Sequence, residues 1–529
     1  MGRSSIPTWQ SGTSPVGGSA KADIPRSSFD RSSSYKSAIQ AGGLYPFFID
    51  EVVPGDTFNL KTSGLCRLST PIFPVMDNMY LETFYFFVPT RLVWENFEKM
   101  MGEQDNPADT TDYLAPVVSY TEGFVEDSLA DYFGLPTNIP DLEAVALPFR
   151  AYHLIWNEWF RDQNLEDSRE VPMDDGPDDP GETLFVERRG KRHDYFTSCL
   201  PWPFKGPAVA IPALGQAPVT GIGVAPAEIS QGAANVKETG NLNATYNQSY
   251  ATDPIQTAIK ASGSGAGATP VIYANLDDTN ESTVNQLRQA FQIQRMYERD
   301  ARGGTRYTEI IRSHFGVVSP DARLQRPEYL GGGHTPININ PIYQSAETSE
   351  SNIGRLSGVG VASFTNHGFV KSFTEHGYII GLCNVRADMS YQQGLNRMWK
   401  RRSKLAYYWP ALSHIGEQAV ESGEIYSDGT SADQDVFGYQ ERYAEYRYKP
   451  SIVTAAMRSS HPESLDAWHL AFDFSVRPQL NKAFIQDYPP IDRVVAVPSE
   501  PQFICDFYHK LTCARPMPMY GTPGYIDHF

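Results

Sequence analysis

The sequence is poor in the residues and patterns that build disulfide scaffolds, metal sites and membrane segments. Only five cysteines occur among 529 residues, and no two have CxxC spacing, so we expect reduced thiols and no bound metal. No run of about eighteen apolar residues is present, which excludes a membrane-spanning helix. The first residues contain no apolar segment, so no secretory leader is predicted, and the chain is expected to stay in the cytoplasm that makes it until lysis.

The sequence also lacks the motifs of the common enzyme classes. Gly221-Ile222-Gly223 and Gly358-Val359-Gly360 have no third glycine and no strand-then-helix context, so neither predicts a nucleotide site. No HExxH and no GxSxG occur, and the eleven histidines are scattered without metal-ligand spacing. We therefore predict no catalytic centre and no cofactor. One enzymatic alternative stays open on fold analogy alone, a β-sandwich glycosidase with an Asp/Glu pair.

Positive charge is scarce in the chain as a whole. The 44 Lys and Arg face 62 Asp and Glu, which gives a net charge of -18 and an isoelectric point near 5.1. A chain with this charge cannot by itself neutralise nucleic-acid phosphates in bulk. Aromatic residues are plentiful, with 29 Tyr, 28 Phe and 8 Trp. Tyr, Trp and Arg are enriched where proteins contact proteins, although a large β-protein without partners would also accommodate them.

Residues 1–40 differ from the rest of the chain. They are rich in Ser and Gly, show almost no apolar period, and carry five basic residues against two acids, a local net charge of +3. We interpret them as an extended arm that is disordered unless something docks it.

From Leu44 onward the pattern is that of β-strands. Phe58 and Leu60 alternate with polar neighbours, and residues 80–88 form an aromatic run that is typical of a buried strand. The same period of two recurs in three later segments, 379–385, 470–476 and 502–511.

Two segments have helical spacing instead. Pro148 is placed at the first turn of one helix, whose aromatic residues recur at helical spacing up to Phe160. Thr283 and Gln286 form a capping box for a second helix, which is expected to end at Gly303-Gly304. Many short strands, with helices in the long connections and no βαβ alternation, predict a mainly β fold, a β-sandwich or jelly roll with large insertions.

The segment 206–282 has little to bury. Its 77 residues include fifteen Ala and nine Gly but no Phe, Trp, Met, Arg, Cys or His. It cannot form an independent core, so we expect a surface insertion between two parts of one core, 41–205 and 283–529. Its only aromatics are Tyr246, Tyr250 and Tyr273. The alternative is a passive surface loop without a partner.

Three charged stretches are the remaining candidates for chemistry. Residues 166–182 carry eight acids and one Arg, which favours a solvated acidic loop over an oxygen-ligand calcium site. Just beyond it lie Arg188, Arg189, Lys191 and Arg192. The two stretches could pair across a subunit boundary, or the basic one could contact phosphate.

The third charged stretch combines cations with aromatic side chains. Its members are Lys400, Arg401, Arg402, Lys404, Tyr407, Tyr408 and Trp409. Cations beside rings that can stack on bases suit a single-stranded nucleic acid. An Arg-rich turn with core aromatics behind it explains the pattern equally well, so both interpretations stay open.

Many motifs in a fixed order identify a family. The longest is ARGGTRYTEIIRSHFGVVSPDARLQRPEYLGGG at 301–333. The others are IPRS (24–27), FDR (29–31), PGDTFNL (54–60), FFVPTRL (86–92), WNEWFRDQNL (156–165), YFTSCLPWP (195–203), FGYQER (437–442) and PGYIDHF (523–529). Together they resemble the major capsid protein of gokushoviruses (Microviridae), small tailless bacteriophages, over nearly the whole chain outside 206–282.

The resemblance implies a viral jelly-roll β-barrel that self-assembles into a T=1 icosahedral shell of about sixty copies around circular single-stranded DNA. It also implies a small basic DNA-binding phage protein as a second source of cations. The insertion 206–282 would form a protrusion at the three-fold axes and contact a host surface receptor. The chain would be made and assembled in the host cytoplasm and end in the virion.

The resemblance also gives the candidate site residues their roles. The residues expected to face DNA are Arg3, Lys21, Arg26, Arg31, Lys36, Lys400, Arg401, Arg402 and Lys404. Tyr246, Tyr250 and Tyr273 become candidates for contacts within the protrusion or with the host. A host-binding phage spike is the non-enzymatic alternative, and it would form trimers but no shells.

Overall fold

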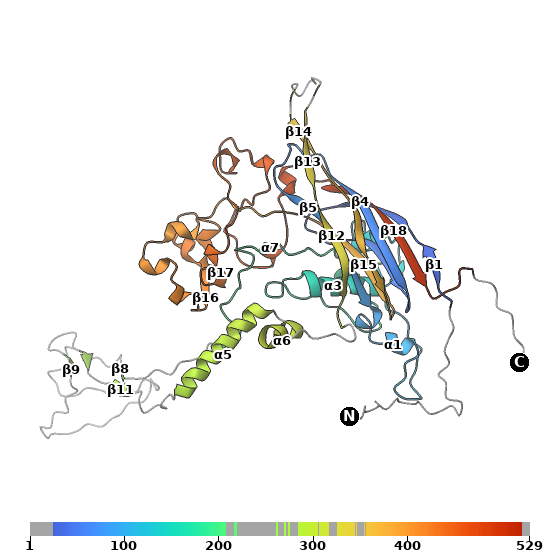
Figure 1. The fold of residues 1–529 in the computed structure, drawn as a ribbon, viewed down its shortest axis with the longest axis horizontal. Coiled ribbons are helices and arrows are strands. Elements are labelled where there is room, and N and C mark those ends of the chain that lie inside the picture. The colour runs from blue at the N-terminus through green and yellow to red at the C-terminus, as the bar shows by residue number, and fades with distance from the viewer. Residues whose placement is uncertain are drawn as a thin grey trace, which may run out of the picture. The chain divides into compact units, whose positions relative to one another are not determined.

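The computed structural model describes most of the chain (Figure 1). The described residues are 25–207, 216–218, 261–262, 269–270, 273–275, 284–304, 306–316, 325–343, 345, 354 and 356–520. The chain divides into two compact units, one formed by Met1–Pro203 with Gly304–Phe529 and the other by Phe204–Gly303.

Two antiparallel sheets form the centre of the first unit. The six-stranded sheet has the order β1 (Ser27–Asp30), β18 (Phe503–Arg515), β4 (Thr57–Leu68), β14 (Leu356–Ser372) and β13 (Asn338–Tyr343), with β2 (Ser33–Ile39) also paired to β18. The four-stranded sheet has the order β12 (Glu328–Pro336), β5 (Met79–Pro89), β15 (Gly377–Ala387) and β3 (Tyr45–Val52). The fold is therefore mainly β and consistent with a jelly-roll sandwich. Its two sheets are open, so the described strands do not close into the predicted barrel.

One apolar core lies between the two sheets, in the first unit. Side chains of β4 and β18, among them Phe58 and Phe507, share a buried cluster with Tyr85 of β5 and Cys383 of β15. Along β18 buried and exposed residues alternate without a break, which confirms the period of two predicted for 502–511. The strands predicted around Phe58, at 80–88 and at 379–385 are confirmed as β4, β5 and β15.

A helical layer covers the other face of the four-stranded sheet. The helix predicted at Pro148 is α3 (Leu147–Ile155), which continues as a π-helical turn over Trp156–Phe160. Phe149 and Tyr152 of α3 pack in a second buried cluster with Phe86 of β5 and Leu382 of β15. The four-stranded sheet is thus buried on both faces, whereas the outward residues of β4 and β18 are exposed.

Short elements complete the first unit. The remaining helices are α1 (Phe97–Met100), α2 (Leu129–Tyr132), α4 (Pro180–Thr183), α6 (Tyr307–Phe315) and α7 (Lys482–Ile485). The remaining strands are β6 (Val117–Ser119) paired with β7 (Glu143–Val145), and β16 (Glu417–Glu421) paired with β17 (Val436–Glu441). No helix in the described ranges has both the length and the hydropathy needed to cross a bilayer.

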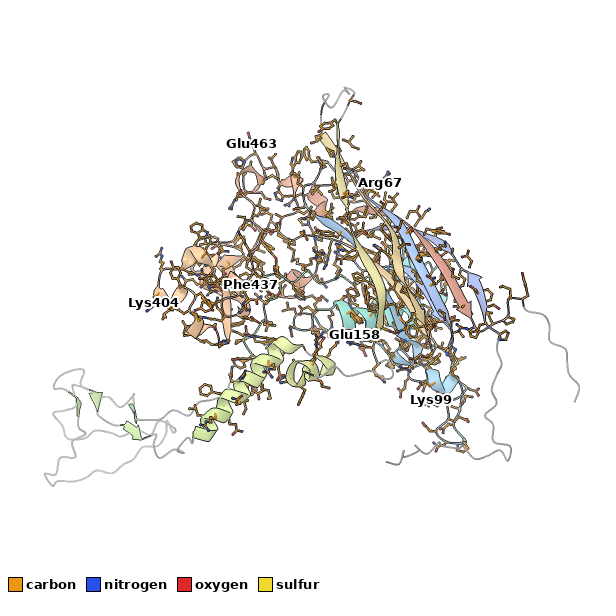
Figure 2. The ribbon with its side chains drawn as sticks, viewed as in Figure 1. Arg67, Lys99, Glu158, Lys404, Phe437 and Glu463 are labelled. Atoms are coloured by element: carbon orange, nitrogen blue, oxygen red, sulfur yellow. The ribbon has the colours of Figure 1, made fainter. Side chains whose placement is uncertain are left out.

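Residues 388–485 form a region of loops and 3-10 turns that we call the aromatic lobe. Its core contains Phe437 and Phe484, and Tyr195 with its neighbours 196 and 199 packs into it. Figure 2 shows Phe437 inside this lobe and Lys404 at its edge. The strand predicted at 470–476 is wrong. Phe472 makes only an isolated bridge to Tyr391, because this segment pairs with no continuous neighbour and its rings pack into the lobe core instead.

Residues 27–30 and 33–39 of the predicted arm form β1 and β2, which pair with β18 of the same chain. Serines mask the period of two there, since only Phe29, Tyr35 and Ile39 supply large apolar side chains. Backbone pairing with β18 orders the segment without help from a neighbour or from DNA.

In the described residues of the unit Phe204–Gly303 there are one long helix and four short strands. Helix α5 (Val284–Gly303) ends where the sequence predicts, while its proposed cap Thr283 lies outside the described residues. Strand β8 (Gln216–Pro218) pairs with β11 (Tyr273–Asn275), and β9 (Ala261–Ser262) pairs with β10 (Thr269–Pro270).

Candidate functional site

The basic stretch 188–192 is engaged within its own subunit. Arg189 of this stretch pairs with Glu82 on β5, and Arg192 pairs with Glu82 at 3.3 Å and with Asp388 at 3.1 Å. Arg386 of β15 adds a contact of 3.2 Å to Glu82. Burial alone would raise the pKa of Glu82, but the surrounding guanidinium charges outweigh it and lower that pKa. Neither a subunit boundary nor a phosphate is needed to explain these cations.

Most of the acidic stretch 166–182 is the solvated loop that the sequence favours, because six of its eight acids are exposed, and only Glu166 and Asp178 are buried. Arg150 of α3 donates to Asp178 from Nε at 2.8 Å, and both side chains are 1% exposed. Trp94 donates from its indole nitrogen to Asp175 at 2.7 Å. The acids near the end of the stretch thus anchor α3 and the segment before it. No group of three or more potential metal ligands occurs within the described ranges.

Lys191 and Asp487 are buried ionisable groups beside this charged cluster. The Lys191 ammonium donates to the carbonyl of Phe484 at 2.6 Å and lies 4.4 Å from the ring centre of Phe472. Burial lowers the pKa of Lys191 to about 8 and raises the pKa of Asp487 to about 6. Both groups therefore titrate closer to neutrality than usual.

The cluster at 400–404 divides into paired and exposed cations. Lys400 pairs with Glu421 at 2.8 Å, and Arg401 pairs with Glu445 at 2.9 Å. The Arg401 guanidinium also lies 4.1 Å from the ring centre of Tyr446. Arg402 and Lys404 are exposed, with Lys404 5.1 Å from the Trp409 ring. Half of the predicted DNA-facing cluster is thus already neutralised by acids of the lobe.

The same segment exposes an unusual number of large apolar side chains. Trp399 is 71% exposed and Leu405 is 65% exposed. Met398, Tyr407, Tyr408 and Trp409 are exposed as well. We call residues 398–409 the lobe surface. Contiguous exposed apolar side chains of this size mark a surface that another molecule covers.

A small cavity lies in the lobe core. Its volume is about 50 Å³, and Tyr195, Tyr391, Glu424, Glu445 and Tyr448 help to line it. Glu424 accepts hydrogen bonds from Tyr195 at 2.9 Å and from Arg397 at 3.1 Å. Burial raises the pKa of Glu424, as in a catalytic acid. The space suits a water molecule or two but no sugar ring, so it does not favour the glycosidase alternative.

The other predicted site residues are dispersed. In the arm, Arg31 pairs with Asp50 at 2.6 Å, Lys36 pairs with Asp506 at 2.7 Å, and Arg26 donates to the carbonyl of Gly55 at 2.7 Å. Four predicted residues, Arg3, Lys21, Tyr246 and Tyr250, lie outside the described residues. Tyr273 begins β11.

A basic surface that the sequence analysis missed lies on the exposed face of the six-stranded sheet, which we call the outer sheet face. Lys61 of β4 and Lys510 of β18 are register partners there, and both are exposed. Arg67, labelled in Figure 2, lies six residues further along β4 on the same face. Alternation in 502–511 places Lys510 outward, but only the register between β4 and β18 places it beside Lys61, which lies 449 residues earlier in the chain.

Comparison with known proteins gives a consistent result along the whole chain. Residues 19–525 match the family described as capsid protein (F protein). The chain is 47% identical to capsid protein VP1 of Bdellovibrio phage phiMH2K, covering 95% of this chain and 96% of that protein. It is 43% identical to capsid protein VP1 of Chlamydia phage 1, over 95% of this chain and 96% of that protein. It is 36% identical to capsid protein VP1 of Spiroplasma virus 4, over 95% of both.

Proposed function

The chain belongs to the capsid protein (F protein) family as a major capsid protein of a Microviridae-type phage, and from this premise we propose that it forms a T=1 shell of about sixty copies around circular single-stranded DNA. The chain is a structural component of the virion and not an enzyme. The family match over residues 19–525 is the observation that carries the proposal.

The lobe surface supplies a contact between copies. Trp and Tyr are the side chains that dominate the energetics of protein interfaces, and Trp399, Tyr407 and Trp409 are all exposed there. Two of the four cations behind them, Lys400 and Arg401, are paired with Glu421 and Glu445, which leaves less positive charge for phosphates and favours a protein partner. Because a shell buries each subunit against identical neighbours, we assign this surface to a second copy of the chain.

An acidic loop at the other end of the first unit complements the lobe surface. The loop 102–112 follows Lys99, which Figure 2 shows far from Lys404. It carries four acids and no cation, and exposed Met101 and Leu114 flank it. The lobe surface offers exposed Arg402 and Lys404. Surfaces at opposite ends of one subunit meet only between copies, in a head-to-tail contact that closes into rings.

The finer roles of the remaining segments belong to the same proposal. A small basic phage protein supplies further cations for the genome, because the chain itself carries a net charge of -18. The insertion 206–282, with Tyr246, Tyr250 and Tyr273, builds the protrusion and contacts a host receptor. The arm residues Arg3, Lys21, Arg26, Arg31 and Lys36 face the genome, after assembly in the host cytoplasm.

Electron microscopy of particles from cells that express the full chain tests the shell. The double variant Trp399→Ser with Leu405→Ser should lower particle yield at least tenfold, while Met76→Ser, which removes an equally exposed side chain elsewhere, should leave it unchanged. Unchanged thermal melting of the double variant would show that its fold is intact. Trimers without shells from the unaltered chain would favour a spike instead.

The head-to-tail contact has a separate test. Arg402→Glu with Lys404→Glu should abolish particles, and adding Glu103→Lys with Asp105→Lys should restore them. Absence of rescue, with all variants folded, would assign the lobe surface to a different region of the neighbouring copy.

A further inference from the structure

The pairing of Lys61 with Lys510 is an unusual feature of the outer sheet face. The two residues are direct register partners on adjacent antiparallel strands, and both side chains point to the exposed face. Like charges directly opposite each other in a sheet are destabilising. Neither lysine forms an ion pair with an acid in the part of the chain that the structure describes. An anion bound between the two lysines would be attracted to both and would relieve their mutual repulsion.

The surroundings of the lysine pair are open and polar. Gly368 of β14 is the register partner of Lys61 on its other side, so no side chain covers the pair from there. A side chain at Gly368 is excluded, because a Cβ would lie 2.0 Å from the carbonyl oxygen of Leu60. Tyr508 and Ser63 are register partners one step along the strands. A hydroxyl and an exposed ring thus lie next to the two ammonium groups.

Positive charge continues along the outer sheet face. Four cations point outward there, Lys36, Lys61, Arg67 and Lys510, against two acids, Asp30 and Asp506, which leaves a net charge of +2. Lys36 already neutralises Asp506. Hydrogen bonds from Ser32 hold the pKa of Asp30 below its ordinary value, so Asp30 stays ionised, with Lys510 close enough to contribute. From Lys61 to Arg67 the strand extends roughly 20 Å. That length matches several nucleotides of a single strand.

We propose that the outer sheet face binds the backbone of the packaged single-stranded DNA, with Lys61 and Lys510 holding one phosphate between them. Tyr508 lies beside this phosphate site and offers a ring on which a base stacks. The hydroxyl of Ser63 beside the lysine pair suits phosphate oxygens, whereas the lobe surface has two of its four cations paired and its large rings exposed. The proposal rests on the proposed enclosure of DNA by the shell, and it names the surface of each subunit that contacts this DNA.

Removal of the two charges should have opposite effects on folding and on DNA binding. In the full chain, Lys61→Gln with Lys510→Gln removes the repulsion, so the melting temperature should rise or stay constant. Affinity for a fluorescent 20-nucleotide oligothymidylate should fall about tenfold near 0.1 M salt, and the slope of log K against log salt should become shallower by about 1. Particles of the variant should carry less DNA, measured as the ratio of absorbance at 260 and 280 nm.

Lys449→Gln with Lys482→Gln is the matched control, because it removes two exposed lysines from the aromatic lobe and leaves the outer sheet face unchanged. Equal loss of oligonucleotide affinity in both double variants would overturn the proposal in favour of a general charge effect. A variant with full DNA content but poor adsorption to cells would also overturn it, in favour of an anionic cell-surface polymer. Absence of particles or of DNA from the unaltered chain would contradict the shell function itself.

Discussion

The sandwich and the aromatic lobe belong to one compact unit but are stabilised by different means. In the sandwich, side chains from both sheets form a single apolar core in which Phe58 and Phe507 are fully buried. The lobe has a smaller core of aromatic rings held by turns, and ion pairs such as Arg401 with Glu445 lie beside it.

The two regions also differ in what they leave exposed. Large apolar side chains in the sandwich point mostly inward, whereas the lobe exposes Trp399, Leu405 and Ile452. A surface of this kind is unfavourable in an isolated subunit and favourable in a contact. The difference teaches that a large apolar core stabilises the sandwich, whereas the lobe keeps apolar side chains on its surface, where we propose that a second copy contacts them.

The largest expected difference between the two regions is the stability that each loses when an aromatic ring is removed from its core. Phe507→Ala removes a ring that contacts the rings of Phe47 and Phe364 between the sheets, and it should lower the free energy of unfolding by about 3–5 kcal/mol. Phe437→Ala in the lobe should lower it by about 2 kcal/mol, because the lobe core is smaller. Urea denaturation of the purified subunit measures both, and equal losses would show that lobe and sandwich unfold as one cooperative structure.

A smaller and more local effect should follow from breaking a lobe ion pair. Glu445→Gln leaves the Arg401 guanidinium without its acid in a largely buried position, which should cost about 2–3 kcal/mol. We expect faster hydrogen exchange in residues 397–448 and unchanged exchange in β4 and β18. The control is Glu441→Gln, which weakens an exposed pair with Arg447 and should change stability by less than about 0.5 kcal/mol. Faster exchange in the sheets would contradict the division into two regions.

Acid should act on two buried groups of the first unit, His509 and Asp487, in opposite directions. The Nε2–H of His509 in β18 donates to the carbonyl of Phe47 at 3.0 Å, and its Nδ1 lies 3.0 Å from the Thr62 hydroxyl. Burial lowers the pKa of His509 to about 4. The unfolded chain therefore takes up this proton first, and the sandwich loses about 3 kcal/mol as the pH falls from 6.5 to 4. Asp487, whose folded pKa is raised to about 6, takes up its proton in the folded state first, so stability rises by a similar amount as the pH falls from about 6 to about 4.

Two variants separate these effects. His509→Gln should gain stability relative to the unaltered chain when the pH is lowered from 7.5 to 4.5, and Asp487→Asn should lose it over the same range. Lys191 keeps its proton over most of this window. Free energies of unfolding at the two pH values measure the changes. Parallel pH profiles for all three proteins would refute both assignments.

The smallest effect concerns thiol reactivity. All five cysteines are buried as free thiols, four in the sandwich and Cys199 in the lobe. Burial raises the pKa of the Cys199 thiol, and the hydrogen bond with the Cys505 thiol, together with burial, raises the pKa of Cys66. We expect iodoacetamide at pH 8 to modify Cys199 several-fold faster than the other four, because the lobe opens locally more often. Mass spectrometry of partly modified protein gives the order, and equal rates would argue for global unfolding as the common step.

The sequence predicts the regular part of the molecule well and the contacts between distant segments poorly. Strand β18 and helix α3 follow from periods of two and 3.6, which depend only on neighbouring residues. The partner of Arg189 is Glu82, 107 residues away, so the basic stretch could not be assigned to a structural role. Residues 470–476 show a strand period without a strand, because their rings pack into the lobe and no neighbour offers a ladder.

In the candidate site, too, contacts between distant segments could not be predicted from the sequence. The cations at 400–404 are visible in the sequence, but their neutralisation by Glu421 and Glu445 requires the fold. The lysine pair on the outer sheet face depends on the register of β4 with β18, which no local pattern encodes.

The position of β18 in the six-stranded sheet sets the timing of folding during synthesis. This strand lies between β4 on one side and β1 and β2 on the other, and its Cys505 meets Cys66 across 439 residues of chain. A ribosome must therefore release almost the entire polypeptide before this sheet gains its inner strand, and such long-range pairing forms slowly. We therefore expect prematurely terminated chains, which lack the strand, to remain incompletely folded and to be unable to join a shell.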